Sequence, residues 1–153
     1  ADGIGMIEVR GPNVCKGYWR NPEKTAADFR ADGFFITGDL GRVDDKGYVH
    51  IVGRGKDLII SGGLNIYPKE VESEIDALPG VVESAVIGVP DADFGEAVVA
   101  VIVGDTTPEA VRAALSDRLA RFKLPKAVHI VDDLPRNAMG KVQKAVLRDR
   151  YGG

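Results

Sequence analysis

The sequence lacks the features that disulfide, nucleic-acid or membrane chemistry needs. Cys15 is the only cysteine among 153 residues, which excludes an intrachain disulfide and agrees with a reducing compartment. The formal net charge is -3 and charges of both signs are interspersed, so the basic stripe typical of nucleic-acid binders is absent. No apolar run approaches the roughly 20 residues that span a bilayer. We therefore expect a cytoplasmic protein with neither nucleic acid nor membrane as a partner.

Several local motifs for catalysis and binding are also absent. Two Gly-Lys pairs, at residues 55–56 and 140–141, lack the Ser or Thr and the upstream glycine of a phosphate-binding P-loop. No dinucleotide-binding glycine fingerprint occurs, and no His/Cys cluster has the spacing of metal ligands. His50 and His129, the only histidines, stand in apparent strands and are expected to be packing or surface residues. The sequence predicts no metal site.

The composition is that of a globular protein, and its pattern changes near residue 56. Hydrophobic residues make up 44% and charged residues 28% of the chain. Residues up to about 52 predict strands and one short helix, which Asn21 caps and Pro22 opens. Helices and strands alternate beyond residue 57, so we expect two structural units. In the second unit we expect helices over 68–78, 108–122 and 141–151, and strands over 58–60, 81–89, 96–103 and 127–131.

A glycine-rich stretch joins the two units. Glycines bracket the short apolar strand expected at residues 58–60, and glycine accepts backbone conformations that other residues resist. The stretch therefore predicts either a hinge beside a backbone-lined binding surface or two ordinary turns around a buried strand. The chain also does not begin with Met, so we expect it to start inside a longer protein.

Two residues stand out as candidates for chemistry. Asp39 follows an apolar strand, and its carboxylate could accept both hydroxyls of a ribose diol; the alternative is an Asp in a turn. Lys141 is expected to open a helix, where the dipole is already positive, so a cation there would make an anion site. The alternative is a solvated lysine in a basic segment with Arg136 and Lys144.

Three segments together resemble the adenylate-forming superfamily of acyl-CoA synthetases, peptide-synthetase adenylation domains and firefly luciferase. Thr37-Gly38-Asp39 is similar to its ribose-binding motif, residues 53–72 to its hinge motif and residues 134–142 to its catalytic-lysine motif. The order and the spacing of the segments match as well. The hinge and lysine segments, with residues 84–90 between them, look closest to bacterial malonyl-CoA or methylmalonyl-CoA synthetases.

The resemblance implies an α+β architecture in two parts. Residues 1–55 would be the β-rich C-terminal end of the large adenylating domain. Residues 56–153 would be the small, mobile α/β C-terminal domain, with a central three-stranded sheet and flanking helices. The family's phosphate loop and its acid-selecting residues belong upstream, so we expect this chain alone to be inactive.

The resemblance also implies a two-step reaction that uses ATP, CoA and Mg²⁺ and releases AMP, with Mg²⁺ held mainly by the missing N-terminal part. Asp39 would hold the ribose hydroxyls, and Arg54 would also contact the nucleotide. Lys141 would bridge the acid and the α-phosphate in the first step. Gly63 would let the pantetheine arm of CoA pass close to the backbone in the second step, and Lys56 would be the hinge between the two steps.

The implied partners are a small carboxylic acid such as malonate, CoA, the missing N-terminal domain, and a lysine acetyltransferase and deacetylase that act on Lys141. Two other functions remain open at this point. The chain could be the tail of an adenylation domain that loads a carrier protein, or a binding module that has lost the chemistry. Intact Asp39, Arg54, Lys56 and Lys141 argue against the binding module.

Overall fold

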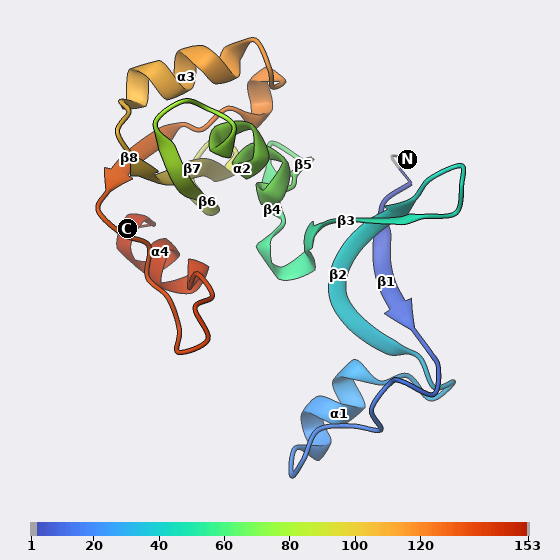
Figure 1. The fold of residues 1–153 in the computed structure, drawn as a ribbon. Coiled ribbons are helices and arrows are strands. Elements are labelled where there is room, and N and C mark those ends of the chain that lie inside the picture. Colours follow the sequence, from blue (N-terminus) through green and yellow to red (C-terminus); the bar gives the residue numbers. More distant parts are fainter. Residues whose placement is uncertain (1–2, 153) are drawn as a thin grey trace. The chain divides into compact units, whose positions relative to one another are not determined.

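The computed structural model describes residues 3–152, which divide into two compact units that meet between Lys56 and Asp57 (Figure 1). We expected this boundary one residue earlier, after residue 55. Each unit is described below by itself. That the first unit is the end of a larger adenylating domain stays a prediction.

The first unit is a three-stranded antiparallel sheet with one short helix. Its strands pair in the order β1-β2-β3, and β2 and β3 form the expected hairpin. The Asn21 side chain accepts a hydrogen bond from the Lys24 backbone N–H, which confirms the predicted cap of the helix. The elements are β1 (Gly5–Val9), α1 (Pro22–Asp28), β2 (Phe35–Val43) and β3 (Val49–Arg54).

The second unit contains a five-stranded sheet. The three long strands that the sequence predicts are present, and two short strands extend the sheet beside them. The strand order is β5-β4-β7-β6, and β8 pairs with β7 in parallel. The strands are β4 (Ile59–Ser61), β5 (Leu64–Ile66), β6 (Val81–Asp91), β7 (Gly95–Gly104) and β8 (Ala127–Val131).

Strand β7 is the centre of the second unit. Its run of Val, Ala and Ile is buried on both faces, as the continuous apolar pattern predicts for a central strand. Val98, Ala100 and Ile102 pack with α2 (Pro68–Asp76) and α3 (Pro108–Ser116). The alternate residues of β7 face a second cluster that includes Leu147 of α4 (Lys144–Tyr151). The sheet therefore separates two apolar layers that hold three helices in place.

The helix expected over residues 108–122 is shorter than predicted. It ends at Ser116, and residues Arg121–Lys123 form a separate 3-10 turn. Leu124 precedes Pro125, and a residue before proline is pushed out of the helical region, so the chain must become extended there. Phe122, expected on the buried stripe of the helix, is instead 41% exposed.

Candidate functional site

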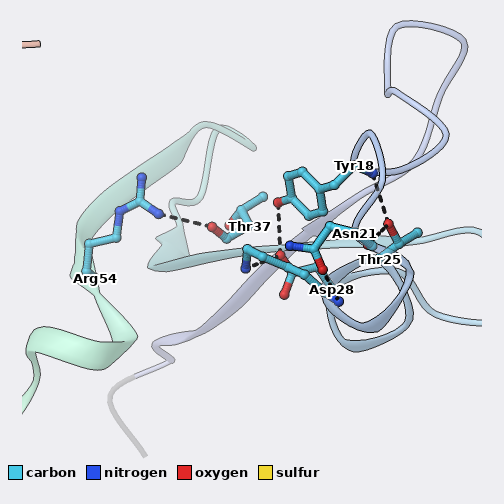
Figure 2. Close-up of polar contacts among 7 residues, drawn as sticks. Tyr18, Asn21, Thr25, Asp28, Thr37 and Arg54 are labelled. Atoms are coloured by element: carbon cyan, nitrogen blue, oxygen red, sulfur yellow. Dashed lines mark hydrogen bonds and ion pairs between the residues drawn. The ribbon is translucent and has the colours of Figure 1, made fainter.

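The two residues expected to bind a nucleotide are brought together in the first unit. Asp39 on β2 and Arg54 on β3 are directly opposite each other in the strand pairing. Arg54 Nε lies 2.8 Å from Asp39 Oδ1. Arg54 Nη1 also donates a hydrogen bond of 3.2 Å to the Thr37 carbonyl oxygen (Figure 2). A carboxylate and a guanidinium thus lie opposite each other at the end of this hairpin that is farthest from its turn.

The Thr37 side chain holds the start of this motif, which lies within β2. Thr37 Oγ1 donates to the Ile7 carbonyl oxygen at 2.8 Å and accepts from the Asp39 N–H at 3.0 Å. Gly38 has a φ of +77°, a left-handed conformation that glycine adopts without strain. The Asp39 carboxylate is therefore oriented by the backbone around it, and it can accept hydrogen bonds from hydroxyl groups.

A second polar cluster in the first unit is a structural support. Asp28 Oδ2 accepts hydrogen bonds from Lys24 Nζ at 2.7 Å and from Tyr18 Oη at 2.9 Å (Figure 2). Both hydrogen bonds lower the pKa of the Asp28 carboxyl below its usual value, and the bond from Lys24 has the larger effect. The same bonds to Asp28 raise the pKa of Tyr18 and of Lys24. The cluster ties the turn before α1 to that helix, close to the surface.

Lys56 lies where the two units meet, in the short 3-10 turn η1 (Gly55–Asp57). Its side chain is exposed and makes no hydrogen bond or ion pair with any described residue. The next residue, Asp57, is held by Arg148 Nη2 of α4 at 2.6 Å. Short 3-10 turns are frequent as connectors, and here the residue after the candidate hinge is anchored to the second unit.

Gly62 and Gly63 make the two-residue turn between β4 and β5. Their φ angles are +58° and +78°, as a type I′ hairpin turn requires. Ser61 and Leu64 pair across the turn. A Cβ built on Gly63 would meet no atom within 4 Å, so the space beside this backbone is open.

A groove of about 670 Å³ begins at this turn. It is lined by Gly62, Leu64 and two exposed aromatic rings, Phe94 and Phe122, with the cations Arg121 and Lys126 beside them. Lys126 is paired with Asp91, whose hydrogen bond raises the pKa of the lysine. Aromatic faces and fixed cations are groups that bind bases and phosphates.

The sequence pattern does not predict this groove. Phe122 ends the helix expected over residues 108–122, and the pattern indicates no role for Phe94. The sequence offers one indication, since Phe122 lies within the basic, proline-containing segment 121–126. Only the sheet brings that segment beside Phe94 and the glycine turn.

Lys141 lies in a loop and does not open a helix, which corrects the prediction. Helix α4 begins at Lys144, three residues later. Asn137 prevents an earlier start, because its side-chain Oδ1 accepts the backbone N–H groups of Met139 and Lys141, each at 3.0 Å. Such local side-chain bonds compete with helix formation. The argument that Lys141 adds charge to a helix N-terminus therefore fails.

The geometry of this loop supports a functional role for Lys141 in another way. Its backbone is bound on both sides, since the Lys141 carbonyl oxygen also accepts from the Asn137 N–H at 2.9 Å. Its exposed amine, in contrast, forms no hydrogen bond or ion pair within residues 3–152. The loop holds a cation in place and leaves its charge available for a ligand.

Within residues 3–152 there is no group of three or more His, Cys, Asp or Glu side chains that could hold a metal ion. In that same part of the chain, no helix has the length and the apolar character that would let it cross a membrane.

Comparison with known proteins places these features in a family. Residues 70–141 match the family described as AMP-binding enzyme C-terminal domain. Feruloyl-CoA synthase of an Amycolatopsis species is 50% identical over 152 residues, and this match covers 97% of the chain and 31% of the relative. A long-chain-fatty-acid–CoA ligase of Mycobacterium tuberculosis is 45% identical over 152 residues, covering 97% of the chain and 30% of the relative.

A solved structure agrees with these relatives. The crystal structure of ATP-bound MatB from Rhodopseudomonas palustris is 67% identical and superposes with a TM-score of 0.90, covering 99% of this chain and 31% of that one. The chain thus spans less than a third of the length of each of these three proteins. Residues 70–141 are an AMP-binding enzyme C-terminal domain, and through it the chain belongs, as a C-terminal portion, to the adenylate-forming superfamily.

Proposed function

We propose that this chain is the C-terminal part of an ATP-dependent acid–CoA ligase. In the first step, a carboxylate oxygen attacks the α-phosphorus of ATP, the bond to the β-phosphate breaks and pyrophosphate leaves. In the second step, the sulfur of CoA attacks the acyl carbon and AMP leaves. The observation that carries the proposal is Lys141, a free amine on a braced loop within an AMP-binding enzyme C-terminal domain.

Lys141 serves the first step. The attack brings a carboxylate, which is an anion, against a phosphate that is also negative. A fixed cation between them lowers the barrier, because it interacts more strongly with the charge of the transition state than water does. Asp39 holds the ribose hydroxyls, and Arg54 supports Asp39 through their ion pair. Residues of the upstream domain would hold Mg²⁺, which would supply positive charge beside the ATP phosphates.

Gly63 and its groove serve the second step. The open space beside the Gly63 backbone lets the pantetheine arm of CoA pass close to the chain. The adjoining groove offers Phe94 and Phe122 for the adenine ring and Arg121 and Lys126 for the phosphates. CoA carries both kinds of group, so one continuous surface suits its whole length.

Two reactions that need different residues at one site require a change of arrangement between them. We propose that the second unit rotates about Lys56, which would present Lys141 in the first step and Gly63 in the second. The free Lys56 side chain and the anchored Asp57 support this position for the pivot.

The acid that we propose is malonate or a similar small carboxylic acid. The similarity to MatB supports it, together with the motif wording that resembles malonyl-CoA synthetases. We also propose that Lys141 is a target of reversible acetylation. An acetyl group removes the positive charge, so it would switch off the first step. The exposure of the amine supports access by an acetyltransferase and a deacetylase.

The test separates the two half-reactions in the intact ligase. Lys141→Ala should slow adenylate formation from ATP and acid by about 10²–10³-fold or more, because one preorganised donor is typically worth that much. Thioester formation from supplied acyl-adenylate should persist. Gly63→Asn is the reciprocal variant, since Asn tolerates the left-handed turn but fills the space beside it, so it should slow only the thioester step.

The outcomes distinguish the competing functions. Near wild-type adenylation by Lys141→Ala would remove the main chemical assignment. A thioester step that accepts a pantetheine-bearing carrier protein and not CoA would assign the chain to a carrier-loading adenylation domain instead. Lys141→Arg should restore little activity, because a guanidinium keeps the charge but not the shape of the amine.

A further inference from the structure

We propose that Arg136, held by Glu83, is a positioning residue for Lys141: it fixes the peptide plane from which the lysine side chain departs. This inference rests on the proposed role of Lys141 in adenylate formation. The protein would thus direct the lysine side chain through its backbone, with no contact to the amine itself.

The peptide between Gly140 and Lys141 is held at both of its polar groups by side chains. Its carbonyl oxygen, on Gly140, accepts a hydrogen bond of 2.6 Å from Arg136 Nη1. Its N–H, on Lys141, donates to Asn137 Oδ1 at 3.0 Å. The backbone groups on either side of this peptide are bound to Asn137, since the Gly140 N–H donates to its carbonyl oxygen and the Lys141 carbonyl oxygen accepts from its N–H, each at 2.9 Å. Together these bonds fix the orientation of the peptide plane.

Arg136 can fix this plane because its own guanidinium is anchored. Its second terminal nitrogen, Nη2, donates to Glu83 Oε2. Glu83 lies on β6 and pairs with Val103 of the central strand β7, so it belongs to the main sheet of the second unit. The guanidinium therefore bridges the sheet and the lysine loop with two parallel donors.

The loop needs this support. Gly140 has a φ of +76° and a Cβ built there would meet no atom within 4 Å, so packing does not restrain this residue. The Lys141 amine has no partner among the described residues that could hold it from its far end. The direction in which its side chain leaves the backbone thus depends on the peptide plane, and a misplacement of about 1 Å can cost about 100-fold in rate.

An ordinary surface ion pair is the competing explanation for Arg136 and Glu83. Their side chains are 42% and 32% exposed, and exposed pairs contribute little to stability. The two explanations predict different results, because only the positioning role requires the contact with the Gly140 carbonyl oxygen. Arg118 and Glu74 provide a matched control pair: they are 44% and 40% exposed, and neither hydrogen-bonds to the lysine loop.

The experiment measures both half-reactions in the intact ligase. Arg136→Ala should lower the kcat of adenylate formation by up to about 100-fold, with little change in the KM for ATP and none in thioester formation from supplied acyl-adenylate. Glu83→Gln should give the same pattern with a smaller loss, and it covers the case in which Arg136→Ala fails to fold. Arg118→Ala and Glu74→Gln should leave both half-reactions unchanged.

Two double variants test the mechanism. Arg136→Ala combined with Lys141→Ala should be no slower than Lys141→Ala alone, because a positioning residue acts only through the group that it positions. Exchanging the charges, Glu83→Arg with Arg136→Glu, should restore the ion pair but not adenylate formation, since a carboxylate cannot donate to the Gly140 carbonyl oxygen.

Each contrary result has its own meaning. Wild-type adenylation by Arg136→Ala, with Lys141→Ala slow, overturns this inference and leaves the proposed function standing. A double alanine variant much slower than Lys141→Ala, or rescue by the charge exchange, also overturns it. A Lys141→Ala variant that adenylates normally overturns the proposed function itself.

Discussion

At the scale of single residues, the candidate groups differ in how their charges are held. Asp39 is already paired with Arg54, and its backbone N–H is bound by Thr37. Lys141 has a braced backbone and a free amine. A paired carboxylate suits persistent binding of a neutral sugar, whereas a free cation suits charge that develops during a reaction.

Asp91 shows how one residue can stabilise the rim of the groove. Its Oδ1 accepts the backbone N–H groups of Asp93 at 3.1 Å and Phe94 at 3.2 Å, while Oδ2 is bound by Lys126 Nζ. The hydrogen bond from Lys126 is the main reason why the pKa of Asp91 is lowered. The same contact orders the turn that carries Phe94 and fixes a cation beside it.

We expect Asp91→Asn to destabilise the second unit at neutral pH and to do so less in acid. A lowered carboxyl pKa stabilises the fold above the unfolded value of about 3.9, and the effect is lost as the pH falls through the folded value. The amide oxygen of Asn keeps the bonds to the turn, so only the ionic contribution is removed. The raised pKa of Lys126 limits the effect at high pH. The contribution of the ion pair to stability is lost as the pH rises through the pKa of Lys126 in the folded protein.

The measurement is a urea titration of the 153-residue chain, followed by the NMR signals of β7, at pH 7 and at pH 3. The wild type and Asp91→Asn should differ more at pH 7 than at pH 3. An equal difference at both values would show that the charge of Asp91 contributes nothing to the stability of this unit.

At the scale of elements, the segment that carries Lys141 is an irregular loop between two anchored ends. Arg136 ties its start to β6 through Glu83. Lys144, the first residue of α4, ties its end to α2, since its Nζ donates to the buried Glu72 at 2.5 Å. A loop with both ends fixed to the sheet and its flanking helix moves with the second unit as a body. This is what a domain that presents one residue and then withdraws it requires.

The turn η1 contains Lys56, the residue that we propose as the pivot between the two units. Lys56→Pro in the intact ligase should slow the change between half-reactions more than it destabilises the fold, because proline fixes φ near −65° and removes backbone freedom at the pivot. Adenylate formation and thioester formation are measured separately, together with the overall rate. Lys56→Ala, which removes the same side chain without fixing φ, serves as the comparison. Equal mild losses in both half-reactions, or no loss, would contradict the hinge assignment.

At the scale of the whole molecule, the chain is two units of different character. The first is a small sheet with many exposed apolar residues, among them Val43, Tyr48, Val49 and Ile51. The second has two apolar clusters around a central strand. The chain spans about 30% of its relatives, and we place the remaining functions, acid selection and phosphate binding, in the part that it does not span.

We therefore expect the isolated 153-residue chain to make no acyl-CoA from ATP, malonate and CoA. Its two candidate sites, the Asp39–Arg54 pair and Lys141, supply only part of the adenylation site that we propose. Pyrophosphate release and thioester formation are measured with malonate and with other small acids. The intact ligase is the positive control, and clear turnover by the chain alone would contradict the proposal that it is one part of a larger enzyme.

The sequence by itself determined the local features of this protein. The alternation of helix and strand beyond residue 57, the cap at Asn21 and the buried strand β7 all follow from nearest-neighbour patterns, and the structure confirms them. The three motif segments also led to the right superfamily, because each is a short run whose residues stand in a recognisable order.

Only the tertiary structure decided which residues meet. It paired Asp39 with Arg54, placed Phe122 in a groove beside Gly62, and joined the start of the Lys141 loop to strand β6. The reason is physical: the decisive bonds join groups far apart in the chain, such as Arg136 with Glu83 at a separation of 53 residues. Local propensity differs by under about 1 kcal/mol per residue between most residue types, so such contacts override it.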